Sequence, residues 1–305
     1  MSEYDLLPAG FPAGIPLARG HASEPAGAEC ARAPHLLTAN ANRNLTIVEP
    51  QTFARASLDG RAANILRSFN TWAFKREQPS EPELMLATIV RSVERSEPVS
   101  FVLYWGKGPR CSIGHWDIEC LDFLNSLARR VREVYLPGAR IRLIFTDTHA
   151  RLNGHLQTAI AHYFADIEKQ ARERGFATCW LGDLIKAPGL NNINMVDDPP
   201  PDMLQNLLAC ASKWYRGSSS PEQGAVDYYR MNMLEKRAVE ISNPHSIFIT
   251  FNGSKFRNLF PPHLPIFYMY SLRRGASTKP WFYPTDAELC TALTCHCSRL
   301  QQQTA

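Results

Sequence analysis

The sequence contains no apolar run long enough to cross a membrane, because no stretch approaches the ~18 uninterrupted apolar residues that a spanning helix needs. We also expect no secretion signal, since Glu3 and Asp5 precede two prolines where a basic region and an apolar region would stand. The net charge of +4 at pH 7 is small and scattered, which does not favour nucleic-acid binding. We therefore expect a cytoplasmic protein that binds neither membranes nor nucleic acids.

Familiar catalytic motifs are missing as well. There is no P-loop, no dinucleotide G-x-G-x-x-G, no kinase set and no Ser-His-Asp elbow. The eight cysteines are dispersed, so free thiols are expected in a chain without a secretion signal. Cys295 and Cys297, with His296 between them, form the one close pair, but no second pair stands at zinc-finger spacing. The pattern favours an adventitious cluster on a C-terminal helix over a metal site.

What is present is the composition of a globular protein with a well-developed core, at 305 residues with 45% hydrophobic and 20% charged residues. Residues 1–45 are rich in alanine, proline and glycine and have little periodicity, which indicates a flexible N-terminal extension. Residues 46–305 are expected to form a single α/β catalytic domain. Whether the extension becomes ordered on binding is left open.

Short apolar runs alternate with helical patterns in the middle of the chain. Strands are expected at 99–105, 141–146 and 176–181, and helices at 51–77, 83–95, 118–135, 157–174, 203–215 and 226–239. Such alternation implies a Rossmann-like α/β fold, a mostly parallel sheet with helices on both faces. The segments "HSIFITF" and "PIFYMYSL" are further strand candidates, and we expect them to form an antiparallel C-terminal edge.

Three polar turns follow predicted strands, where ligands of an open parallel sheet bind. They are Gly106–Glu119, Thr146–His155 and Asn252–Lys255. In the first turn, two glycines flank Lys107 and allow the backbone to approach a ligand closely, while Arg110 adds a second cation. Asp117 opens the next helix, where it either contacts substrate or caps the helix.

The second turn, "TDTHARLNGH", is the densest polar cluster after any predicted strand. Asp147 can act as a base or hold a substrate amine, and His149 and His155 can move protons near neutral pH. Arg151 and Asn153 supply further polar groups for substrate binding. Alternatively, Asp147 caps the following helix and the histidines serve packing or the surface. A metal site built on the two histidines lacks a third ligand.

The third turn places Asn252 and Lys255 after a predicted strand. Lys255 can bind an anionic group of a substrate. Tyr268, Tyr270 and Trp281 can wall a pocket for an apolar or aromatic ligand, although the aromatic residues also fit a simple core and hairpin.

The order of these segments resembles the isocyanide (isonitrile) synthase family of pyoverdine- and dityrosine-type biosynthesis, over about residues 62–283. The similar stretches are "ILRSFNTWAFKRE", "RSEPVSFVLYWGKGPR", "DFLNSLARRVREVYLPGARIRLIFTD", "NPHSIFITFNGSKFRNLFPPHLP" and "KPWFY". The resemblance implies a Rossmann-like fold and an enzyme that converts the amine of an amino acid, typically tyrosine or tryptophan, to an isocyanide. Ribulose 5-phosphate would supply the carbon as a co-substrate, and no metal or other cofactor is expected.

The resemblance also implies roles for individual residues. Lys107 matches the family's lysine after the first strand, and Asp147 matches its strand-end aspartate. Lys255 matches a basic group near the last strands, and Trp281 matches the tryptophan of a Pro-Trp pair. The site requires Lys107 and Asp147 to face one shared cleft.

Two departures from the family pattern leave alternatives open. The lysine turn reads "WGKGPR" instead of a proline-rich loop, and "DTH" stands where the family has Asp-Gly-Arg, with the arginine displaced to Arg151. One alternative is an S-adenosylmethionine-using transferase or cyclase that forms a non-proteinogenic amino acid on the same scaffold. Another is a non-catalytic binding module. For the isocyanide synthase and for the S-adenosylmethionine-using enzyme, the expected partner is a small-molecule amino acid substrate. A homodimer is compatible with each hypothesis.

Overall fold

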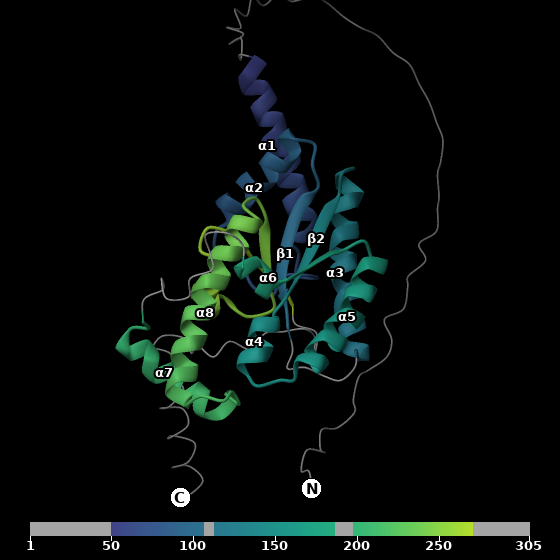
Figure 1. Ribbon diagram of the computed structural model, residues 1–305. Helices are drawn as coiled ribbons and strands as arrows, with labels where there is room; N and C mark the ends of the chain where they lie inside the picture. The colour runs from purple at the N-terminus through teal and green to yellow at the C-terminus, as the bar shows by residue number, and fades with distance from the viewer. Residues whose placement is uncertain (1–49, 107–112, 187–197, 271–305) are drawn as a thin grey trace, which may run out of the picture. The chain divides into compact units, whose positions relative to one another are not determined.

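A sheet of five strands lies at the centre of the computed structural model, which describes residues 50–106, 113–186 and 198–270 (Figure 1). The strands are β1 (Val99–Trp105), β2 (Ala139–Phe145), β3 (Ala177–Trp180), β4 (Ile247–Thr250) and β5 (Ile266–Tyr268). Their order is β3-β2-β1-β4-β5, and every neighbouring pair is parallel. This confirms the expected α/β fold. The expected extension, residues 1–45, lies outside the described residues.

The helices expected from periodicity are present, but the first ends at Phe69 and not at Glu77, because residues 70–77 form turns. The helical segments are α1 (Pro50–Phe69), α2 (Pro82–Glu94), α3 (His115–Val134), α4 (Asp147–Leu152), α5 (Gln157–Glu173), α6 (Leu181–Ile185), α7 (Pro201–Trp214), α8 (Pro221–Ser242) and the 3₁₀ helix η2 (Ser254–Leu259). The short segments α4, α6 and η2 were not predicted, because five or six residues are too few to show a helical period.

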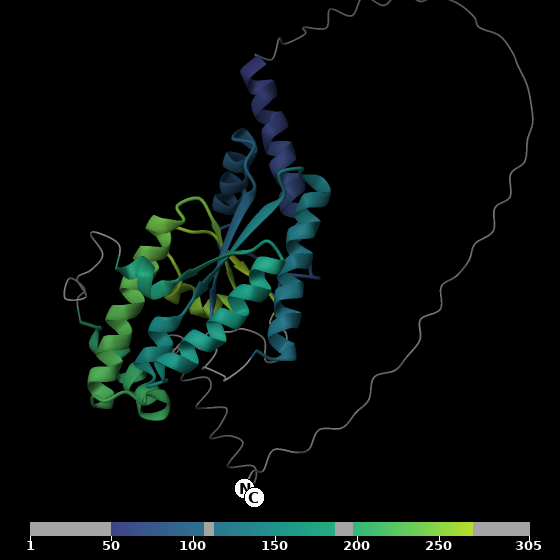
Figure 2. The ribbon, with the colours of Figure 1, turned by 45° about the vertical axis from the view of Figure 1, so that its right-hand side comes forward.

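Different helices cover the two faces of the sheet. On one face, Leu103 of β1 packs in a cluster with Leu124 of α3 and residues of α1, α2 and α5. On the other face, Val102 of β1 packs with Leu181 of α6 and Val239 of α8. Figure 2 shows α3 and α5 on one side of the sheet and α8 on the other. Successive β1 residues point to opposite, buried faces, which explains why the strand reads as a continuous apolar run.

The expected antiparallel C-terminal edge is wrong. β5 runs parallel to β4, with Ile266 opposite Phe248. The connecting segment contains η2, and it is long enough to carry the chain back to the same end of the sheet, as parallel pairing requires. An antiparallel contact occurs instead as a single bridge at the outer edge of β5, between Met269 and Lys75.

The strand order places the carboxyl ends of β1 and β2 side by side. Trp105 and Phe145, the last residues of these strands, are paired, and the backbone N–H of Thr146 donates to the carbonyl of Trp105 at 3.0 Å. The chain places β2 and β3 to one side of β1 and β4 and β5 to the other, so the sheet has a switch point between β1 and β4. Ligands of doubly wound sheets bind outside the carboxyl ends of the strands at such a point.

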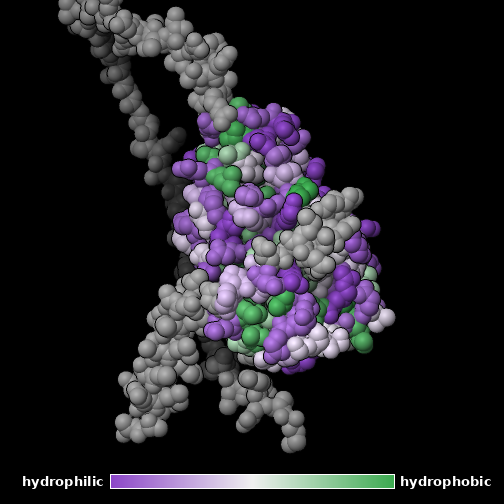
Figure 3. All heavy atoms as spheres, turned by 60° about the vertical axis from the view of Figure 1, so that its left-hand side comes forward, coloured by the Kyte–Doolittle hydropathy of each residue, from purple (hydrophilic) through white to green (hydrophobic). Residues whose placement is uncertain are grey.

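The exposed apolar residues in the described part of the chain are scattered over the surface. On the face in Figure 3, hydrophilic residues dominate and hydrophobic residues form only small groups. The large exposed apolar side chains of the described residues come from separate elements: Trp72, Leu84, Val134, Leu136, Leu156, Ile241 and Tyr270. None of the described helices has both the length and the apolar character needed to span a membrane.

Candidate active site

The second polar turn folds into the short helix α4, which begins directly at the end of β2. Its first residue, Asp147, is almost fully buried, and its Oδ2 lies 2.7 Å from Nη2 of Arg151 one turn later. Its Oδ1 accepts a hydrogen bond of 2.9 Å from the backbone N–H of Gly182, in α6. Both carboxylate oxygens are therefore engaged within the protein.

The contact at Gly182 is close. A Cβ at this position would lie 2.6 Å from both Oδ2 of Asp147 and Nη2 of Arg151, too close for any larger residue without movement. The carboxylate therefore joins α4 to α6. This arrangement supports a positioning role for Asp147 more directly than a role as a free base.

His149 forms the second polar contact of α4, and this contact reaches a residue distant in sequence. Its Nε2 lies 2.6 Å from Oε2 of Glu235 on α8. The hydroxyl of Thr148 donates to the other oxygen, Oε1, at 2.5 Å. Glu235 is completely buried, and these two partners compensate its loss of solvation. A buried imidazole–carboxylate pair thus lies at the carboxyl end of β2.

Glu235 belongs to a polar stripe on the buried face of α8. Tyr228, Asn232 and Glu235 recur at helical spacing, and the ring of Tyr228 meets the ring of His149 edge-on at 5.6 Å. Asn232 is buried, and its Oδ1 has no hydrogen-bond partner among the described residues. This stripe could not be predicted from the sequence, because glutamate and asparagine in a helix ordinarily face solvent.

Tyr104, near the end of β1, faces the same region from the sheet. Its hydroxyl is buried and has no hydrogen-bond partner in the described part of the chain. Burial, followed by the negative charge of Glu235, raises the pKa of Tyr104 well above its ordinary value. The hydroxyl therefore stays protonated at neutral pH and remains available as a donor.

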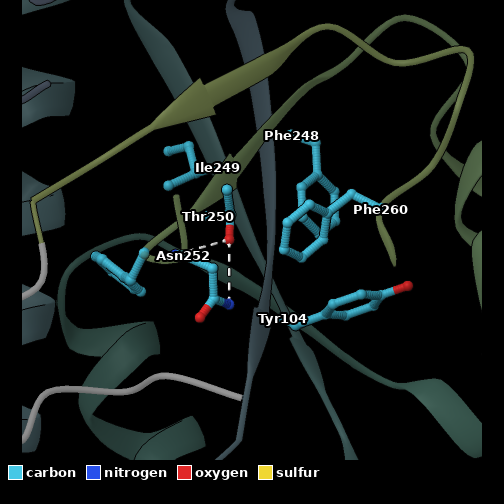
Figure 4. Close-up of a pocket in the computed structure, with 7 residues that line it drawn as sticks. Tyr104, Phe248, Ile249, Thr250, Asn252 and Phe260 are labelled. Carbon is cyan, nitrogen blue, oxygen red and sulfur yellow. Dashed lines mark hydrogen bonds between the residues drawn. The ribbon is translucent and has the colours of Figure 1, made fainter. Parts of the chain in front are cut away.

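A pocket lies at the switch point between β1 and β4, and Tyr104 forms part of its wall (Figure 4). Its lining residues are Tyr104, Phe248, Ile249, Thr250, Phe251, Asn252 and Phe260, and the hollow between them is small and partly open to solvent. The backbone N–H and the side-chain Nδ2 of Asn252 both point to Oγ1 of Thr250, at 3.1 and 3.5 Å. In Figure 4 the Tyr104 hydroxyl is directed away from these two residues.

The remaining predicted residues of the second turn lie apart from the buried pair. Asn153 ends α4, and its Nδ2 donates to the carbonyl of His149 at 2.9 Å. His155 is exposed before α5, makes no side-chain contact with His149 within the described chain, and has its pKa lowered by partial burial. Among the described residues, no group of three or more His, Cys, Asp or Glu side chains could hold a metal ion.

Asp117 occupies the helix-capping position that the sequence left as an alternative to substrate binding. Its side chain is fully buried, with Oδ2 accepting from the N–H of Gly114 at 2.9 Å and Oδ1 accepting from the hydroxyl of Tyr163 at 3.1 Å. Lys255 is exposed, with its Nζ 5.3 Å from the centre of the Phe256 ring. Five predicted residues lie outside the described ranges: Lys107, Arg110, Trp281, Cys295 and Cys297.

The described cysteines are free thiols, as expected: Cys120, Cys179 and Cys210. Burial raises the pKa of Cys179 to about 11, so this thiol is protonated and unreactive at neutral pH. Among the described residues, Cys179 is therefore not a candidate nucleophile.

Comparison of the sequence with models of protein families finds no match, and neither does comparison with curated proteins. Comparison of the fold with solved structures does find similar chains. One is the PvcA protein from Pseudomonas aeruginosa, with a TM-score of 0.51 and 18% sequence identity over 72% of this chain and 87% of that chain. The chain is thus a Rossmann-like α/β protein that shares its fold with PvcA.

Proposed function

We propose that this protein is a biosynthetic enzyme of specialised metabolism that acts on the α-amino group of an amino acid, in the manner of isocyanide synthases. The observation that carries the proposal is the buried pair of His149 and Glu235 at the carboxyl end of β2. Converting an amine requires removal of protons from nitrogen, and an imidazole is the side chain best suited to that task near neutral pH.

The sequence resemblance to isocyanide synthases and the Rossmann-like fold support this choice independently of each other. The pocket at the switch point adds a third argument, because the rings of Tyr104, Phe248 and Phe260 line it. Aromatic rings of this kind can pack against the edge of an aromatic substrate, and the resemblance to isocyanide synthases implies tyrosine or tryptophan. We therefore propose an aromatic amino acid as the substrate.

The co-substrate is proposed to be ribulose 5-phosphate, bound through its phosphate. Lys107 and Arg110 follow β1, whose end lies beside the start of α4. Lysine and arginine are the usual partners of phosphate groups. In this proposal His149 accepts a proton from the substrate, and Asp147 holds α4 in place through Arg151 and Gly182. No metal or other cofactor takes part.

The test is a reaction of the purified protein with tyrosine or tryptophan and uniformly ¹³C-labelled ribulose 5-phosphate. We expect an isocyanide product that mass spectrometry detects with one labelled carbon, and no product from a His149→Gln variant. A parallel reaction contains S-adenosylmethionine in place of the sugar phosphate. Consumption of that compound would identify the transferase or cyclase alternative, and absence of any product in both reactions would contradict an enzymatic role on these substrates.

A further inference from the structure

We infer that Glu235 and Thr148 are positioning residues, which hold the imidazole of His149 in the tautomer that leaves Nδ1 as the proton acceptor. The proton-transfer step rests on the proposed function. The tautomer itself does not, because it follows from contacts inside the protein.

The carboxylate of Glu235 determines which ring nitrogen carries the proton. Nε2 of His149 lies 2.6 Å from Oε2, and an ionised carboxylate only accepts hydrogen bonds, so Nε2 must donate its N–H. The other oxygen, Oε1, already accepts from the Thr148 hydroxyl at 2.5 Å. With both oxygens engaged, the carboxylate cannot turn away from the ring.

The remaining nitrogen is the basic one. In a neutral imidazole with a protonated Nε2, the lone pair belongs to Nδ1. The hydrogen bond that the His149 ring makes with a described residue runs through Nε2 and not through Nδ1. The His149 side chain is 11% exposed while that of Glu235 is 0% exposed, so the imidazole is the member of the pair that a ligand can reach.

The proton transfer balances in charge. The N–H bond of the substrate ammonium breaks, a new N–H bond forms at Nδ1, and the electron pair stays on the substrate nitrogen as its nucleophilic lone pair. The resulting imidazolium keeps its Nε2–H bond to Glu235, so the positive charge forms beside a buried negative charge. Such a pair is stabilised more strongly in a low-dielectric site than in water. The proton then passes from Nδ1 to solvent.

The described surroundings of the pair are polar. Tyr228 meets the imidazole edge-on, and Tyr104 and Asn232 approach from β1 and α8 with neutral side chains. The stabilisation of the imidazolium is therefore expected to depend chiefly on Glu235.

The direct test is nuclear magnetic resonance of protein labelled with ¹⁵N-histidine, which needs no substrate. The chain has nine histidines, and the His149→Gln variant identifies the signals of this one. At neutral pH we expect a protonated Nε2 and an unprotonated Nδ1 in the wild type. The Glu235→Gln variant should show both tautomers, because an amide donates as well as accepts. The matched control is Glu222→Gln, at an exposed position of the same helix. This variant should show the same ¹⁵N signals as the wild type.

The kinetic test separates positioning from a purely structural role. Glu235→Gln is expected to lower kcat about 100-fold with little change in KM. The imidazolium forms only when the proton is transferred, and the variant then lacks the negative charge that stabilises it. Thr148→Val, which keeps the side-chain shape, should lower kcat about tenfold and serves as the second variant if Glu235→Gln fails to fold. Glu222→Gln should leave both constants unchanged.

Two results would overturn the inference. One is an unprotonated Nε2 in the wild type, and the other is a Glu235→Gln variant with wild-type tautomer signals and kcat. If the wild type makes no product, the proposed function fails, yet the tautomer measurement still decides the inference about Glu235, and the same measurement on Thr148→Val decides it for Thr148.

Discussion

Two tyrosines near the carboxyl edge of the sheet illustrate how burial alone does not define a residue's role. The hydroxyl of Tyr163 accepts from the indole N–H of Trp105 at 3.3 Å and donates to Asp117 at 3.1 Å. The equally buried hydroxyl of Tyr104 has no partner in the described chain. A polar group kept in the core without a hydrogen bond costs stability, and such a cost is often found at functional sites.

Replacing these tyrosines by phenylalanine should therefore have opposite effects. Tyr104→Phe is expected to leave the free energy of unfolding unchanged or raise it by up to ~1 kcal/mol, while activity falls. Tyr163→Phe should lower it by about 1–3 kcal/mol, because Asp117 then loses a buried donor. Urea unfolding measures both. A clear loss of stability in Tyr104→Phe would show that its hydroxyl has a structural partner.

Glycines offer a second test at the scale of single residues. Gly182→Ala is expected to destabilise the protein by about 1–3 kcal/mol, because its Cβ would press on Asp147 and Arg151. Gly60→Ala is the matched control, since Gly60 lies in α1 with nothing within 4 Å of the added Cβ. It should raise the free energy of unfolding by ~0.5–1 kcal/mol through helix propensity. Thermal unfolding of both variants checks the pair, and equal effects would contradict the close contact at Gly182.

At the scale of elements, the crossover between β4 and β5 is held by acidic residues from the segment before α2. Oε2 of Glu77 accepts from the N–H of Ser254 at 2.8 Å, at the start of η2. Glu81 lies 2.6 Å from Nε of Arg257, whose guanidinium also donates to three carbonyls of the segment that follows. These contacts fix the crossover that makes β5 parallel to β4.

Glu77 makes the stability of this region depend on pH. Burial raises its pKa, but the hydrogen bonds from Ser254 and the charge of Arg76 outweigh burial, so the pKa of Glu77 lies below its ordinary value of 4.5. A lowered folded-state pKa means that the contribution is present above pH 4.5 and is lost as the pH falls through the folded-state value. Glu77→Gln should cost about 1 kcal/mol at pH 7 and almost nothing at acidic pH. Urea unfolding at pH 7 and at a pH below the folded-state pKa of Glu77 tests this. An equal loss in the free energy of unfolding at both pH values would contradict it.

The elements also show what the sequence reveals and what it leaves out. The existence of the long helices was predicted, although the first ends eight residues earlier than expected, and Val99–Trp105 matches its strand at both ends. The direction of β5 could not be predicted from the sequence, because two apolar runs joined by a long segment can pair in parallel or antiparallel. The polar residues of α4 were recognised as one cluster, but the partner of His149 is 86 residues away, and only the packing of α8 against α4 brings Glu235 to it.

At the scale of the whole molecule, the strand order predicts ligand binding at the switch point between β1 and β4, where the pocket lies. Ligand binding to the folded state alone raises the melting temperature. Tyrosine or tryptophan at ~100 times its Kd should therefore raise the melting temperature of the wild type by roughly 5–10 °C. Thr250→Val should lose most of this shift, since Thr250 orients Asn252 at the pocket wall.

The matched control for Thr250→Val is Thr178→Val. It removes a hydroxyl from β3, at the other edge of the sheet, and this hydroxyl donates a hydrogen bond to Glu168. It should keep the full ligand-induced shift, although its melting temperature without ligand falls slightly. If Thr178→Val loses the shift and Thr250→Val keeps it, the ligand binds beside β3. The switch point would then organise the fold of this protein without serving as its binding site, and the pair of His149 and Glu235 would need a substrate that enters from another side of α4.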